Sequence, residues 1–177
     1  MALRRLITRS LVLAIPICVF SSAIVAERIS DISNTKHNLS TSGPGDVKAV
    51  SETQICVFCH TPHAAEAIPN APLWNRGDYA ETYTPYTSTS INASDIAATP
   101  GGSSKLCLSC HDGTIAIGSV NVANGQVNVL INMAGTGPGG VMPDRDDVAI
   151  DTGFTRNLGT DLTNDHPISF TYDDTLA

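Results

Sequence analysis

The sequence predicts a largely irregular fold with short helices and one small β-hairpin near residues 119–131. Three observations support this class. No long amphipathic helix can be drawn, and stretches rich in Gly, Pro, Ser and Thr separate the apolar segments. Aromatic residues make up only 5% of the chain, which leaves little material for a large core. Finally, a Cys-x-x-Cys-His sequence occurs twice, and we expect a short helix at each copy.

The chain begins with a predicted secretory signal peptide, residues 1–26. Arg4, Arg5 and Arg9 precede an apolar stretch at 11–20, and small residues follow up to Ala26. This stretch is shorter than the roughly 20 apolar residues that a bilayer-spanning helix needs. We therefore expect residues 27–177 to form one exported domain, periplasmic or extracellular, with no membrane span.

Loss of the signal peptide makes the chain more acidic. The formal net charge changes from −7 to −10, because residues 1–26 hold three Arg and no acidic residue. An acidic surface does not favour binding to nucleic acid or to an anionic membrane. We expect neither as a partner.

Four cysteines remain in the exported domain, and zinc, disulfide or redox, and haem chemistry compete for them. The pairs Cys56/Cys59 and Cys107/Cys110 are separated by 47 residues, whereas zinc ribbons leave about 15–20. Neither zinc nor a redox Cys-x-x-Cys explains why His follows both pairs.

Covalent haem explains every position of both motifs. Two thiols one helical turn apart add to the vinyl groups of the porphyrin, and the next residue turns an imidazole onto the iron. We predict two covalently bound c-type haems. Cys56, Cys59, Cys107 and Cys110 hold the porphyrins, and the proximal iron ligands are His60 and His111.

Six segments resemble a known family over most of residues 31–174: KHNLS, CVFCHTPH, APLWNR, YTPYTS, SSKLCLSCHDGTIAIG and NLGTDLTNDHPISFTY. They are similar to the N-terminal dihaem part of exported multihaem c-type cytochromes with the doubled C-x-x-C-H motif. The resemblance implies a haem-organised fold, electron transfer, haems in close stacked series and His on both faces of each iron. Relatives generally continue into further haem motifs, so the chain is expected to be either a naturally short member or a truncated one.

Three further histidines, His37, His63 and His166, are candidate distal ligands, one more than two irons need. Each lies in polar, turn-rich sequence that can hold the backbone and hydrogen-bond the second ring nitrogen. We interpret the competing sulfur ligands, Met133 and Met142, as packing residues.

We expect His166, the only His downstream of His111, to complete the second haem, and His37 the first. His60 already fills its own iron, and a three-residue segment cannot circle the porphyrin to the opposite face. His63 is therefore expected to face an iron of a different haem, in a longer chain or in a neighbouring subunit. In the rival arrangement His63 completes the second haem and His166 faces outward.

The region between the second motif and the C-terminal His contains the predicted hairpin. Valines alternate on both sides of Asn124-Gly125, the dipeptide typical of a two-residue hairpin turn. Two strands alone are only marginally stable, so we expect the hairpin to lean on a haem.

The ligand count favours an electron carrier over an enzyme. A reductase needs one open iron face, whereas a surplus of His closes both faces of each iron. The sequence thus predicts an exported dihaem electron-transfer cytochrome with no substrate chemistry, whose partners are other redox proteins or multihaem cytochromes, with self-assembly through His63 as an option. The alternatives are an electron-input or docking subunit of a larger multihaem reductase complex, and a haem-based sensor.

Overall fold

The computed structural model describes residues 31–68, 71–77, 82–93, 95–144 and 157–171. The expected signal peptide lies outside these residues. Within them, regular structure is short and the intervening segments are irregular. In chain order the elements are η1 (Ile32–Asn34), β1 (Lys48–Ala49), η2 (Cys56–Phe58), β2 (Glu66–Ile68), β3 (Ala71–Trp74), α1 (Gly102–His111), β4 (Ser119–Ala123), β5 (Gln126–Leu130), β6 (Met133–Ala134) and η3 (Pro138–Gly140).

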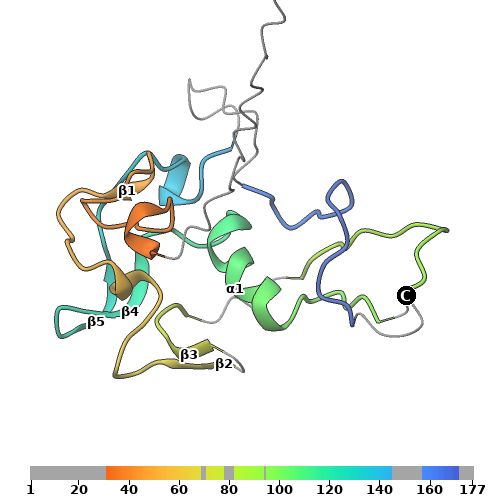
Figure 1. Ribbon diagram of the computed structural model, residues 1–177, viewed down its shortest axis with the longest axis horizontal. Coiled ribbons are helices and arrows are strands. Elements are labelled where there is room, and N and C mark those ends of the chain that lie inside the picture. Colours follow the sequence, from red (N-terminus) through yellow and green to blue (C-terminus); the bar gives the residue numbers. More distant parts are fainter. Residues whose placement is uncertain (1–30, 69–70, 78–81, 94, 145–156, 172–177) are drawn as a thin grey trace, which may run out of the picture.

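The helices at the two Cys motifs are as predicted, although they differ in type. The first motif forms the 3₁₀ turn η2, and the second forms the last turns of α1. Figure 1 shows α1 in the middle of the molecule, with β1, β4 and β5 on one side and the segments around residues 85–100 and 157–171 on the other. The second motif therefore occupies the centre of the described structure.

The predicted hairpin is confirmed as the antiparallel pair β4–β5. Asn124 and Gly125 connect the strands with φ angles of 51° and 76°, and two positive φ values define the type I′ turn. Val120 on β4 is buried, whereas Val127 on β5 is 67% exposed. One strand thus packs inward, and the other forms the outer edge.

Two further antiparallel pairs connect distant parts of the chain. β2 pairs with β3 directly after the first motif, and β1 pairs with β6 across more than 80 residues (Figure 1). The β1–β6 pair has a register of Lys48 opposite Ala134 and Ala49 opposite Met133. It closes the N-terminal segment onto the chain that follows the hairpin.

Buried apolar side chains form three small clusters, and each one includes or packs against a residue of a Cys motif. The first cluster contains Val57 and Phe58 of the first motif, the second packs against Cys110, and the third contains Leu108. The hairpin belongs to the first cluster and so leans on the first motif; its expected contact with a haem stays a prediction. The first cluster consists of Ala49, Val57, Phe58, Val120, Ala123 and Ile131. The second consists of Val47, Ile117 and Met142, and the third of Tyr83, Leu108 and Leu162.

The two methionines pack as predicted. Met142 is a buried member of the second cluster, and Met133 packs against both the first and the second. Among the residues described, no helix is long and apolar enough to cross a membrane.

A close backbone contact at Gly118 gives a test of this architecture. The Ile131 N–H donates to the Gly118 carbonyl over 2.8 Å, and a Cβ at position 118 would lie 1.9 Å from the Ile131 carbonyl oxygen. Gly118→Ala is expected to lower the free energy of unfolding by about 1–3 kcal/mol, because the backbones must move apart. Urea unfolding measures this change.

Gly77→Ala is the matched control for Gly118→Ala. A Cβ at position 77 would meet its nearest atom, Asn121 Oδ1, at 3.5 Å, which is an ordinary contact. Its effect should stay within about 0.5 kcal/mol. Equal losses in the two variants would contradict the packing described at Gly118.

Candidate haem-binding site

The first Cys motif is one tight turn with its middle residues buried. The N–H groups of Cys59 and His60 both donate to the Cys56 carbonyl, at 3.1 and 2.8 Å. Val57 and Phe58 point into the apolar cluster, while Cys56 is exposed and Cys59 is half-buried. The apolar pair Val57 and Phe58 anchors the turn, Cys56 is left at its outer side, and Cys59 packs against the same cluster.

The ring of His60 is held in the orientation that a proximal ligand needs. Its Nδ1 lies 3.0 Å from the Pro72 carbonyl oxygen, and because a carbonyl can only accept, Nδ1 carries the proton. The other ring nitrogen, Nε2, then keeps its lone pair for a metal. The ring itself is exposed.

The second motif completes α1. Cys107 is exposed, Leu108 and Ser109 are buried, and Cys110 is half-buried, which repeats the exposure pattern of the first motif. His111 is the last helical residue, and its carbonyl accepts from the Leu158 N–H over 2.6 Å. The same Cys-x-x-Cys-His sequence thus gives the same exposure pattern on two different backbones.

Asp112 and Gly113 shape the chain directly after the second motif. Asp112 is buried, and its carboxylate accepts from the Thr114 N–H and hydroxyl and from the Tyr83 hydroxyl, at 2.9, 2.9 and 2.5 Å. Gly113 has a φ of 73°, a left-handed conformation that glycine adopts without strain. Together they turn the chain sharply away from His111.

The two motifs lie side by side at their half-buried thiols. The pKa of the Cys59 thiol is raised to about 11, chiefly by burial and also by the Cys110 and Cys56 sulfurs, while the Arg76 guanidinium lowers it. Cys59 packs against the first apolar cluster and Cys110 against the second, and Leu39 and Met133 pack against both clusters, which places the two thiols in neighbouring surroundings. None of the four motif cysteines is in a disulfide.

A buried dipeptide, Asn75-Arg76, connects both motifs. The Asn75 amide donates to the Val57 carbonyl over 2.5 Å and to the Val122 carbonyl over 2.7 Å, and its oxygen accepts from the Val122 N–H over 2.9 Å. The Asn75 N–H also donates to the Cys59 carbonyl over 3.0 Å. Asn75 therefore holds the first motif against the hairpin.

Arg76 does the same for the second motif. Its guanidinium donates to four backbone carbonyls, those of Ser109, Ala116, Ile117 and Ser119, at 2.8, 3.2, 2.7 and 3.1 Å. Arg76 is fully buried. Four carbonyl dipoles stabilise its charge in place of water.

In the segment 74–76, two buried nitrogen donors have no acceptor among the described residues. They are the indole Nε1 of Trp74 and the Nε of Arg76. A buried donor without a partner costs about 1–3 kcal/mol. Haem propionates are carboxylates that could accept from such donors, so these two atoms fit the predicted cofactor, as do the paired thiols and the Nε2 of His60.

The three remaining histidines all have exposed side chains and lie in different surroundings. The ring centroid of His37 lies 6.4 Å from that of His111, beside the second motif. The Nδ1 of His166 lies 3.2 Å from the carbonyl oxygen of the adjacent Pro167. His63 follows a turn in which the Thr61 hydroxyl donates to the His63 carbonyl over 2.9 Å, so His60 and His63 do not share a helix.

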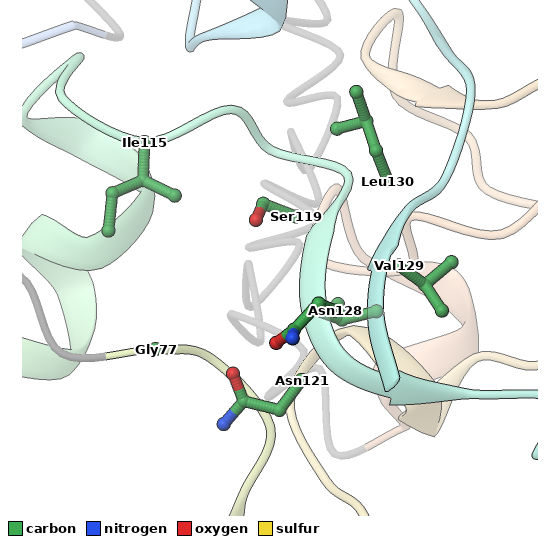
Figure 2. A pocket seen from close by; sticks show the side chains of 8 residues that line it. Gly77, Ile115, Ser119, Asn121, Asn128, Val129 and Leu130 are labelled. Carbon is green, nitrogen blue, oxygen red and sulfur yellow. The ribbon is translucent and has the colours of Figure 1, made fainter. Parts of the chain in front are cut away.

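A shallow pocket of about 290 Å³ lies between the hairpin and the segment after the second motif (Figure 2). Asn121 and Asn128 lie together on one side, and Ile115 on the other. None of the candidate Cys or His residues lines this pocket. Its lining is Gly77, Ile115, Ser119, Val120, Asn121, Asn128, Val129 and Leu130.

No protein-family model and no curated protein sequence matches the chain.

The sequence did not identify Asn75 and Arg76 as site residues. The only available signal was the unusual segment Trp74-Asn75-Arg76, in which polar and charged residues follow an apolar stretch directly. Nothing in that pattern indicates which distant carbonyls the side chains reach.

Replacement of Arg76 tests whether it joins the motifs. Arg76→Met keeps the length of the side chain but removes a donor from four carbonyls, of which that of Ala116 also accepts from the Ser119 N–H, so we expect a loss of about 3 kcal/mol or more in the free energy of unfolding. Urea unfolding measures the loss. Lys36→Met, which removes one exposed positive charge, is the control and should change little. Similar small effects in both variants would contradict the role of Arg76.

Proposed function

We propose that the chain is an exported dihaem c-type cytochrome that transfers electrons through bis-His-ligated haems and carries out no substrate chemistry. The observation that carries the proposal is the pair of Cys-x-x-Cys-His motifs, each with its first cysteine exposed, its second half-buried and its middle residues buried. A bound haem supplies a one-electron iron couple. The chain supplies the attachment, the axial imidazoles and a fixed scaffold.

The scaffold suits an electron carrier because it holds the motifs rigidly. Asn75 fixes the first motif, Arg76 fixes the second, and the Pro72 carbonyl holds the ring of His60. Little reorganisation is then needed when the charge on an iron changes. Two further classes remain open: an electron-input or docking subunit of a larger multihaem reductase complex, and a haem-based sensor, which needs an exchangeable iron face.

The closeness of Cys59 and Cys110 supports transfer between the haems. Each thiol is the attachment point of a porphyrin edge, so the two edges would lie near each other inside the protein. Cys56 and Cys107 are exposed, so part of each porphyrin's attachment side would stay accessible to redox partners. Other redox proteins or multihaem cytochromes are the expected partners.

Haem content is the first test. Expression with a signal peptide and a haem-attachment system should give two haems per chain by pyridine haemochrome and an intact mass increased by two haems. The Cys56→Ala,Cys59→Ala variant is the control and should carry one. Unmodified thiols in the purified exported protein would overturn the proposal.

Carbon monoxide separates a carrier from a sensor or a reductase. With both axial positions of each iron closed by imidazole, carbon monoxide added to the dithionite-reduced protein should leave the Soret band unchanged. A shifted band would mean an open iron face and would favour the sensor or reductase classes.

Within the same proposal, His63 is the residue that connects one chain to another haem. Its ring is exposed, and its backbone is set by the Thr61 turn. We propose that it ligates an iron outside the chain's own pair. In His63→Ala the monomer should keep two low-spin haems while larger assemblies, measured by light scattering, are lost. A high-spin monomer would instead assign His63 to an internal haem.

A further inference from the structure

We propose that His37 and His111 are the two axial ligands of one iron, that of the second haem. The inference rests on the proposed covalent haems and assigns a ligand pair within them. It differs from the pairing expected from sequence order, in which His37 served the first haem and His166 the second.

The separation of the two rings is the first argument. Metal–imidazole nitrogen bonds are about 2.0–2.1 Å long, and the centre of an imidazole lies roughly 1.1–1.2 Å from its nitrogen. Two imidazoles on opposite sides of one metal therefore have centroids about 6.2–6.6 Å apart. The rings of His37 and His111 are 6.4 Å apart.

The angle between the rings agrees with shared ligation. The plane of each imidazole contains the metal–nitrogen axis, and the two planes can take any rotation about that axis. The observed interplanar angle of 75° is therefore compatible with one common axis. Edge contacts between rings can also occur at such distances, so the positions of the two backbones must carry the rest of the argument.

The backbone of His37 is fixed in place by its buried neighbour Asn38. The Asn38 amide donates to the Ser33 carbonyl over 2.9 Å, and its oxygen accepts from the Ser40 N–H and hydroxyl at 3.1 and 2.7 Å. The His37 N–H itself donates to the Thr35 hydroxyl over 3.2 Å. The imidazole thus projects from an ordered loop.

Leu39 attaches this loop to the apolar clusters of both motifs. It packs against the second cluster, which also packs against Cys110, and against the first, which contains Val57 and Phe58. The Leu39 carbonyl accepts from the Ala49 N–H over 2.7 Å. The segment with His37 is thereby held where the two motifs meet, and the position of its ring beside that of His111 assigns it to the second haem.

The test uses the exported holoprotein and a spectral tag on each haem. Cys107→Ala leaves the second haem attached through Cys110 alone, so that one vinyl group stays unsaturated and its absorption band moves to the red. Cys56→Ala tags the first haem in the same way. Both cysteines are exposed, so neither change removes packing.

His37→Ala is then introduced into both tagged proteins, with His166→Ala as the control. We expect one of the two haems to become high-spin in His37→Ala, to bind carbon monoxide, and to return to low spin when free imidazole is added. The affected haem should carry the red-shifted band in the Cys107→Ala background and the normal band in the Cys56→Ala background. Either background alone is sufficient for the assignment.

Three results would overturn the pairing: two low-spin haems in His37→Ala, a high-spin first haem in that variant, or a high-spin second haem in His166→Ala. In each of them two haems are still attached, so the proposed function stands while the pairing fails. A protein that carries no haem would contradict both the pairing and the proposed function. The electron paramagnetic resonance spectrum adds a check, because nearly perpendicular imidazoles give a more anisotropic low-spin signal than parallel ones.

Discussion

The arrangement of the site depends on Asn75 and Arg76, two adjacent buried side chains that bind backbone carbonyls from three separate segments. Asn75 binds the first motif and β4, and Arg76 binds the second motif and the chain leading into β4. Both side chains donate to buried carbonyls, and a buried carbonyl that lacks a donor is costly. The relative position of the two motifs is thus set by these hydrogen bonds together with the small apolar clusters.

This dependence on polar contacts follows from the composition of the chain. Four Phe and one Trp cannot fill a large continuous core, and the described buried apolar residues divide into three small clusters. Each cluster is built on or against a motif residue: Val57 and Phe58, Leu108, or Cys110. On the proposed function, porphyrins bound at the same motifs would extend these clusters, because a large apolar cofactor supplies the buried surface that the side chains do not.

The local features of the fold could be predicted from the sequence, and the distant contacts could not. The hairpin follows from alternating valines and Asn124-Gly125, and the helical turns follow from the geometry of Cys-x-x-Cys. The pairing of β1 with β6 involves two residues on each strand, too few to show any periodicity. The binding of Arg76 to four carbonyls has no sequence pattern either, because a buried Arg and an exposed Arg are the same letter in a sequence.

The pairing of the histidines is likewise a distant contact that the sequence does not predict. Residue type and spacing predict His60 and His111 as proximal ligands, but the distal partner of each depends on how loops close in space. Sequence order suggested His166 for the second motif, because it lies downstream. The structure instead holds His37 there, through Asn38 and Leu39, which are ordinary loop residues in the sequence. If His37 belongs to the second haem, His63 and His166 are the remaining imidazoles for the first. Because the proposed function gives His63 an iron outside the chain's own pair, His166 is then the ligand that must reach the iron of His60 from within the chain.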